Sequence, residues 1–587
     1  GGKISNIDGL IRANGTANLF FINPNGIIFG QNARLNIGGS FLGSTANSIV
    51  FNDEFNFSAI NPKVTPLLTV NVPIGLQFGD GIGEIRAVGT GNGFTTKNPL
   101  ATPIERNINN TSGLQVKAGN TLALIGSNVN LEGSTLTAEG GRIELGGVEK
   151  GLVSLNFTTS GFTVNYEQVR SFRDINLSQQ AAVDASGQGS GSIQIVGRQV
   201  SLTNGSMALI QNQGAQPSGE IRVNAFESLK LIGTSLDGTV RSGLLTETLA
   251  SGNGGNIIVS TNLLSVIDGA QIFAKSISSG TGGNVNVNAA QTTEVRGFSI
   301  VNPGAFSWVG TIAISSGNAG NVTTSTGKLI ITDGATVSAP TVGSGNGGNV
   351  TLNVSELVEV IGSIPNISQP SSVGSATSNT GDVGDVTVNT SRVVLRDGGI
   401  ITTSTLAQGS AGNLTVNATD SIEVTGRAVG GGLPSRIESS APIEAEEFRR
   451  RFGLPDAPSG NSGSVTINTP RLTIADGARV SVANEGTGIA GNLNINANSI
   501  VLLDSKGGIT AATASGEGGN INLSTNFLQL RNASQISTQA GGTGNGGNIT
   551  INTNNIALLE NSQINANAFE GAGGNIRINT QGLFNSA

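Results

Sequence analysis

The sequence predicts an all-β protein, a right-handed parallel β-helix with roughly 28-residue repeats and a few surface loop insertions. The first observation is a motif of the type Gly-x-Gly-Gly-Asn that returns at a nearly fixed interval. Its last residue, which we place at a corner of each coil, recurs at Asn256, Asn284, Asn321, Asn349, Asn413, Asn492, Asn520, Asn548 and Asn575. The interval is 28 residues from Asn256 to Asn284 and from Asn520 to Asn548. A fixed period of this length is typical of solenoids, in which each coil contacts only its neighbours.

The second observation is an alternation of aliphatic and polar residues inside each repeat. In the coil that begins at Asn256, segments 257–260 and 264–267 alternate in this way, and Asp268-Gly269 precedes a third alternating segment. A period of two residues is typical of strands with one buried face. We therefore expect three short strands per coil, with aliphatic side chains stacked inside the helix.

The third observation is the composition, which also excludes several classes of protein. The 587 residues include 87 glycines, and only 12% of the residues are charged. The absence of cysteine and histidine excludes disulfides, thiolate nucleophiles and imidazole bases or metal ligands. A net charge of −7 offers no basic face for nucleic acid, and no apolar run is long enough to span a membrane. We expect no cofactor.

The recurring turn and corner residues have a metal-binding and a structural interpretation. Carboxylates aligned at successive Asp-Gly turns could bind calcium, as in nonapeptide repeats. However, Asn532 and Glu560 take the place of the aspartate in two of the coils. We therefore favour turn chemistry, in which Asp or Asn caps a tight turn, and predict no metal site. The corner asparagines are expected to hydrogen-bond from coil to coil.

Longer intervals between motifs predict insertion loops near residues 297–315, 362–382 and 426–462. The last contains a charged, helical-looking stretch from Glu444 to Phe452, which is interpreted either as a solvated helix covering an edge or as a partner-contact site. The insertion with Trp308 is a second candidate contact surface, unless the indole packs onto the coils.

The N-terminal region contains the segment Asn23-Pro24-Asn25-Gly26-Ile27 between two apolar stretches. Asn-Pro-Asn-Gly is a strong β-turn signal, in which Pro24 fixes φ, Asn25 tolerates the left-handed region and Gly26 relieves the exit. Together with residues 9–30, 35–41 and 67–79, this segment resembles the filamentous-haemagglutinin-type secretion domain of two-partner secretion (TpsA-like) exoproteins, in its cyanobacterial branch.

The resemblance implies a division of the chain and an export route. Residues 1–150 would be the C-terminal part of the secretion (haemagglutination activity) domain, in a sequence that is N-terminally incomplete. Residues 151–587 would be a repetitive β-helix rod with the insertion loops. The implied partner is an outer-membrane TpsB-type transporter, whose periplasmic POTRA domains would engage the region of Asn23 to Ile27.

The expected function is that of a secreted or outer-membrane surface-associated exoprotein, an adhesin or extracellular matrix component that contacts cell-surface glycans or proteins. The alternative is a polysaccharide-binding or polysaccharide-degrading β-helix protein. A degrading enzyme would need clustered carboxylates from adjacent coils. Asp382 and Asp385 are the close acidic pair in the repeat body, and Asp385 occupies a motif corner. We therefore expect no enzyme activity and assign no catalytic residue.

Overall fold

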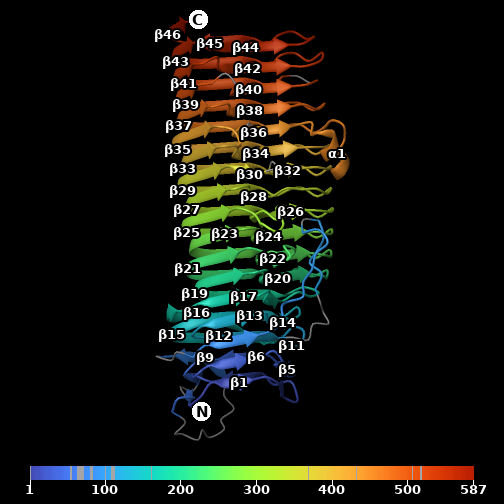
Figure 1. Cartoon of the computed structure of the whole chain (residues 1–587), viewed down its shortest axis with the longest axis vertical. Coiled ribbons are helices and arrows are strands. Elements are labelled where there is room, and N and C mark those ends of the chain that lie inside the picture. The colour runs from blue at the N-terminus through green and yellow to red at the C-terminus, as the bar shows by residue number, and fades with distance from the viewer. Residues whose placement is uncertain are drawn as a thin grey trace. The chain divides into compact units, whose positions relative to one another are not determined.

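The computed structural model describes residues 2–52, 56–61, 72–79, 83–99, 101–106, 113–159, 161–365, 367, 369–430, 432–504, 507–515 and 518–586. The chain forms two compact units. The N-terminal unit comprises Gly1–Ala289 with Ser299–Ala305, and the C-terminal unit comprises Ala290–Phe298 with Phe306–Ala587. Each unit consists of stacked β-coils (Figure 1).

A coil contains one long and one short strand, each hydrogen-bonded in parallel to its counterpart in the next coil. In the N-terminal unit, β21 (Ile221–Ile232) pairs with β23 (Ile257–Ile267), and β22 (Gly243–Thr248) pairs with β24 (Gln271–Ser276). Aliphatic residues at equal heights are in register, for example Leu229 with Leu264, and both are buried. These parallel, stacked pairs confirm the predicted parallel β-helix.

Most main-sheet strands of the N-terminal unit before β19 are shorter than β21. The main-sheet strands there are β1 (Ser5–Ile7), β3 (Leu19–Ile22), β4 (Ile27–Phe29), β6 (Phe41–Ser44), β10 (Ile85–Val88), β12 (Thr121–Gly126), β13 (Val129–Glu132), β17 (Ile175–Ser178) and β19 (Ser192–Thr203). The other strands of these coils are β2 (Leu10–Arg12), β5 (Arg34–Asn36), β11 (Leu114–Val116), β14 (Thr135–Ala138), β18 (Ala182–Asp184) and β20 (Met207–Asn212).

The C-terminal unit continues the same two-strand design. Its long strands are β27 (Val322–Thr332), β29 (Val350–Ile361), β33 (Val386–Arg396), β35 (Leu414–Thr425), β37 (Val465–Ala475), β39 (Leu493–Leu502), β41 (Ile521–Leu530) and β43 (Ile549–Leu559), followed by β45 (Ile576–Asn579) and β46 (Gly582–Ser586). Its short strands are β26 (Trp308–Ala313), β28 (Thr336–Ser338), β32 (Ser372–Thr377), β34 (Ile400–Thr405), β36 (Arg436–Ala441), β38 (Arg479–Asn484), β40 (Gly508–Thr513), β42 (Gln535–Ala540) and β44 (Gln563–Ala568). The division between the units falls within β25 (Val285–Arg296).

The prediction of three strands per coil is wrong in one respect, because the first two segments form one bent strand. In β23 the bend lies at Thr261, whose hydroxyl donates to the carbonyl of Leu263 at 3.2 Å. Thr525 in β41 makes the equivalent bond to Phe527 at 3.1 Å. The hydroxyl satisfies a backbone acceptor at the bend, so the strand changes direction without leaving the sheet.

The Asp-Gly pairs form tight turns between the long and short strands. Asp268 and Gly269 both have positive φ, 57° and 93°, and Asn532 with Ala533 repeats the conformation at 53° and 56°. Two successive left-handed residues define a type I′ turn, which Asp, Asn and Gly adopt most readily.

Antiparallel hairpins replace the tight turn in some coils. They cover residues 233–242 in the N-terminal unit and 362–371 and 426–435 in the C-terminal unit. Residues 363–364 and 369–370 form β30 (Ser363–Ile364) and β31 (Gln369–Pro370). The hairpins are shorter than the predicted insertions because β32 and β36, which follow them, belong to the coils. Residues 366, 368 and 431 of those insertions lie outside the described residues.

The charged stretch beyond β36 contains a helix, α1 (Glu446–Phe452), which lies beside the coils of β34 and β36 (Figure 1). Its first turn is acidic and its last turn is basic, which suits the helix dipole. Gly453 ends the helix in a left-handed conformation, and Arg449 binds Asp456 at 2.8 Å. Phe448 and Phe452 remain 40% and 56% exposed.

An antiparallel sheet lies outside the coils of the N-terminal unit. It consists of β7 (Ser48–Phe51), β8 (Asn56–Ser58), β9 (Pro73–Phe78), the later part of β15 (Arg142–Thr158) and β16 (Gly161–Phe172). The first part of β15 is a coil strand, which pairs in parallel with β12 and β19. It packs a second core against the coils, with Phe78 and Phe162 almost fully buried. Part of the stretch 67–79 used for the resemblance, residues 67–71, lies outside the described residues.

A second extrahelical feature of the N-terminal unit is a crossing segment, which we define as residues 92–99 and 101–106. It runs past β18, β20, β22 and β24, and its blue trace is visible beside β20 and β22 in Figure 1. Phe94 and Ile104 of this segment are buried. Nothing in the sequence pattern predicted that the short strands of these coils would be covered on their outer face.

Candidate functional site

The motif Asn23-Pro24-Asn25-Gly26-Ile27 forms a hydrogen-bonded β-turn between β3 and β4. The Gly26 amide donates to the Asn23 carbonyl at 3.1 Å, and the Asn25 amide donates to Asn23 Oδ1 at 3.0 Å. Gly26 has a φ of 120°, whereas Asn25 is not among the residues with positive φ. The expectation of a left-handed Asn25 is therefore wrong, and the pattern is that of a type I turn with glycine last.

Neighbouring coils hold this turn on both sides. Asn23 Nδ2 donates to the Lys3 carbonyl at 3.0 Å and to Ser5 Oγ at 2.8 Å in the preceding coil. On the other side, the Ile27 amide donates to the Glu84 carbonyl at 2.9 Å. A Cβ atom on Gly83 would lie 2.2 Å from the Pro24 carbonyl oxygen, so only glycine permits this approach. The turn is fixed in place, while the Asn25 side chain is exposed.

A cavity of about 930 Å³ opens next to the exposed side of the turn. Pro24 and Asn25 line it together with Gln77 of β9, Lys3 and Lys150. The two lysines give it a cationic rim. The turn, the first coil and the extrahelical sheet therefore meet at one solvent-accessible hollow.

The corner asparagines lie before the first residue of the long strands and bond from coil to coil. The backbone amide of each corner residue donates to the side-chain oxygen of the preceding one, for example Asn284 to Asn256 at 2.8 Å and Asn349 to Asn321 at 2.9 Å. The C-terminal unit continues this pattern through Asn413, Asn492, Asn520, Asn548 and Asn575. The bonds satisfy backbone donors that have no strand partner at the corner.

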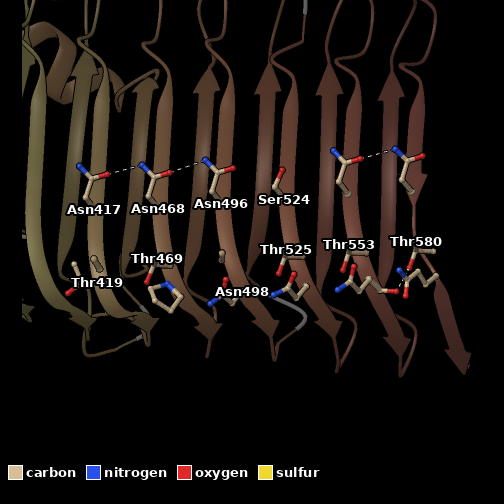
Figure 2. Close-up of a pocket in the computed structure, with 18 residues that line it drawn as sticks. Asn417, Thr419, Asn468, Thr469, Asn496, Asn498, Ser524, Thr525, Thr553 and Thr580 are labelled. Atoms are coloured by element: carbon tan, nitrogen blue, oxygen red, sulfur yellow. Dashed lines mark hydrogen bonds between the residues drawn. The ribbon is translucent and has the colours of Figure 1, made fainter.

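A second ladder of amides, which sequence reasoning missed, lies four residues after the corners of the C-terminal unit. Asn389, Asn417, Asn468 and Asn496 each donate from Nδ2 to Oδ1 of the preceding rung, at 2.8 to 3.0 Å, starting from Asn353. Figure 2 shows the rungs Asn417, Asn468 and Asn496 on neighbouring strands, and Ser524 in the next position of the row. The recurrence of Asn four residues after each corner was a signal that could have revealed the ladder.

The second ladder forms one wall of a groove along the C-terminal unit, which we name the amide groove. It follows the bend of the long strands and has a volume of about 1100 Å³. Its 18 lining residues carry no charge, and they are Asn417, Ala418, Thr419, Asn468, Thr469, Pro470, Asn496, Ala497, Asn498, Ser524, Thr525, Asn526, Asn552, Thr553, Asn554, Asn579, Thr580 and Gln581. Amide and hydroxyl groups of successive coils thus point into a single long depression (Figure 2).

The acidic pair in the repeat body is engaged in the corners. Asp382 Oδ1 accepts the Ser410 amide and Asp385 Oδ1 accepts the Asn413 amide, both at 2.8 Å. Each carboxylate therefore replaces an asparagine in the same structural bond. Among the described residues, no group of three or more Asp or Glu side chains could hold a metal ion.

The two candidate contact surfaces from the sequence differ in exposure. Trp308 is only 4% exposed and lies in β26. It therefore cannot present an exposed aromatic cluster. The α1 helix is exposed and has no buried residue.

The N-terminal region is similar to a known domain family. Residues 1–195 match the family model of the TPS secretion domain. This match extends beyond the boundary at residue 150 that the sequence suggested. No curated protein matches the chain. No helix within the described residues is long and apolar enough to cross a membrane.

Proposed function

We propose that this chain, whose residues 1–195 match the TPS secretion domain, is a two-partner secretion exoprotein of the filamentous-haemagglutinin type that acts outside the cell as an adhesin or an extracellular matrix component. The domain implies secretion through a TpsB-type partner. Its division at about residue 195 into a secretion domain and a repetitive adhesive rod is part of the proposal.

The observation that supports an adhesive role is the amide groove, which repeats the same polar groups over successive coils of the C-terminal unit. A repeated array suits many weak contacts to a repetitive surface, because contacts on one rigid body reinforce each other. A hydrolase or lyase needs a few clustered acids instead, and the Asp382 and Asp385 carboxylates are used by backbone amides. These features favour binding over polysaccharide degradation.

For the export step, we propose that the turn Asn23 to Ile27 and the neighbouring hollow contact the POTRA domains of the transporter. The turn is rigid because Asn23 bonds to the coil before it, and it presents the exposed Asn25 side chain beside Lys3 and Lys150. A rigid turn with a cationic rim can recognise a partner without first paying the entropy of ordering a loop.

Export yield tests this part of the proposal. Asn25→Ala, expressed with the cognate transporter, should reduce the extracellular amount, whereas Asn36→Ala on an exposed strand position nearby should not. The purified variant should keep its β-sheet circular dichroism, because the Asn25 side chain is exposed and its 3.3 Å bond to Asn23 Oδ1 lies within the turn itself. Unchanged export of Asn25→Ala would refute a recognition role for this turn.

Adhesion is tested with the purified full chain by measuring both its binding to cell surfaces or extracellular matrix and its release of sugar fragments. The second measurement tests the polysaccharide-degrading alternative. Saturable binding to cell surfaces or extracellular matrix without release of reducing sugars supports the adhesin. Sustained release of sugar fragments that is abolished by Asp382→Asn would favour the degrading alternative and refute our proposal.

A further inference from the structure

The amide groove has a regular chemistry that points to a class of ligand. Each inner rung of the second ladder uses one N–H and one oxygen lone pair for its neighbours, as Asn468 does between Asn417 and Asn496. A side-chain amide has two N–H donors and two lone pairs on its oxygen. Each inner rung therefore retains one donor and one acceptor for a ligand.

The second wall of the groove is fixed by the strand bends. Thr469, Thr525 and Thr553 donate their hydroxyls to backbone carbonyls two residues further on, at 2.9 to 3.2 Å. These bonds fix the bend in three coils of the groove, whereas Ala418 and Ala497 stand at the same position in two others. The groove is therefore preorganised, which lowers the entropy cost of binding.

We propose that the amide groove binds a neutral glycan chain lying along the stack of coils. A sugar hydroxyl both donates and accepts a hydrogen bond, so it matches the one donor and one acceptor that each inner rung, such as Asn468, retains. Successive coils offer amide or hydroxyl groups at a spacing of about 4.8 Å, and an extended glycan repeats its hydroxyls over a similar length. The inference rests on the adhesive function proposed above and specifies the ligand class.

The lining disfavours other ligand classes. It contains no lysine or arginine to pair with a sulfated or uronic acid chain, and no carboxylate to bind a cation. Arg471 and Asp420, which follow the lining residues Pro470 and Thr419 in sequence, form an ion pair with each other at 2.6 Å. An apolar peptide would displace water from the exposed amides of the groove without replacing the hydrogen bonds that this water makes. A neutral, hydroxyl-rich chain meets these conditions.

The row is interrupted at Ser524, which gives a site for a test that spares the ladder. Ser524 is exposed in the middle of the groove, and the described hydrogen bonds of the ladder do not include its side chain. Ser524→Arg would place a long cation where the glycan should lie. Gln539→Arg is the matched control, because Gln539 is exposed on β42 in the same coil but outside the groove.

The experiment titrates full chain with hexasaccharides of a neutral β-glucan, α-glucan and mannan, and with an oligogalacturonate of equal length. We expect saturable binding of at least one neutral chain, little change between 50 and 500 mM salt (about a tenfold range), and no binding of the oligogalacturonate. Ser524→Arg should weaken binding about tenfold or more, and Gln539→Arg less than about twofold.

The outcomes separate the glycan inference from the adhesin proposal. If the chain adheres to cells but binds none of the neutral hexasaccharides, the glycan inference is refuted and the adhesin proposal stands. The same inference fails if Ser524→Arg and Gln539→Arg bind a neutral chain equally well, because the ligand then lies elsewhere. If neutral glycan binding is lost only in Ser524→Arg while cell adhesion is absent in every variant, the inference holds and the adhesin proposal fails.

Discussion

The crossing segment of the N-terminal unit covers a buried ion pair, and breaking this pair should release the segment. Lys275 Nζ lies 3.0 Å from Glu247 Oε1, and the two side chains are 1% and 0% exposed. Gln211 is in register with Glu247 on the preceding coil, and Lys275 is in register with it on the next. The main-chain N–H of Ile104 donates to both Glu247 oxygens, at 3.0 and 3.2 Å.

The change is Lys275→Met, which keeps most of the side-chain volume and removes the charge. Removing one partner of a buried ion pair costs about 3–5 kcal/mol, because the other charge remains buried. Glu247 keeps the Ile104 amide and Gln211 Nε2, at 2.8 Å, so we expect a cost of about 3 kcal/mol, near the low end. The crossing segment also loses the bond from Lys275 to the Thr102 carbonyl at 3.3 Å.

Amide hydrogen exchange at Ile104 measures the release of the segment directly. A loss of about 3 kcal/mol in local stability should speed exchange at this amide roughly 100-fold. The double variant Glu247→Gln/Lys275→Met removes both charges while Gln still accepts the amide, so exchange should return most of the way to the wild-type rate. The control is Arg396→Met, which breaks an exposed 2.8 Å pair with Glu423 and should cost at most about 1 kcal/mol.

Two results would refute this reasoning. If Lys275→Met leaves exchange at Ile104 unchanged, the ion pair does not hold the crossing segment. If the double variant exchanges as fast as Lys275→Met, the effect comes from lost packing of the lysine side chain and not from an unpaired buried charge.

Three further predictions test other parts of the fold. Glu144 is fully buried, and burial raises its pKa to about 8 despite Arg142 at 3.2 Å. Because the folded protein retains this proton to higher pH than the unfolded chain does, the free energy of unfolding should fall by roughly 4 kcal/mol from pH 4.5 to 8 and level off above that. Denaturant unfolding of Glu144→Gln should not show this decline. Gly83→Ala should destabilise the motif turn by about 1–3 kcal/mol and reduce export. Gly9→Ala is the control and should do neither, because there is open space around Gly9. Equal melting temperatures for the two variants would contradict the packing argument. Thr525→Val should cost about 1 kcal/mol by removing the bond to Phe527, and a denaturation midpoint equal to that of Thr550→Val on the neighbouring strand would show that the bend needs no hydroxyl.

The sequence was sufficient for features that depend on local chemistry and short-range periodicity. The 28-residue interval gives the coil, since every coil repeats the same corner, and the Asp-Gly pair gives the tight turn because both residues tolerate positive φ. The resemblance around Asn23 to Ile27 indicated a secretion domain from a contiguous motif, and the TPS secretion domain model matches residues 1–195. The bend at Thr261 was missed, because a polar residue between two alternating segments looks the same in a turn as in a bent strand.

The tertiary structure alone decided which chain segments cover the coils. Glu247 and Lys275 alternate with buried residues and would be assigned to a solvent-facing side from the sequence, yet both are buried beneath residues more than 140 positions earlier in the chain. The amide groove likewise depends on stacking, because one asparagine per coil forms a wall only when successive coils are in register. Local sequence propensity determines the strands and turns of each coil, whereas long-range packing determines which faces of the coil are exposed to solvent.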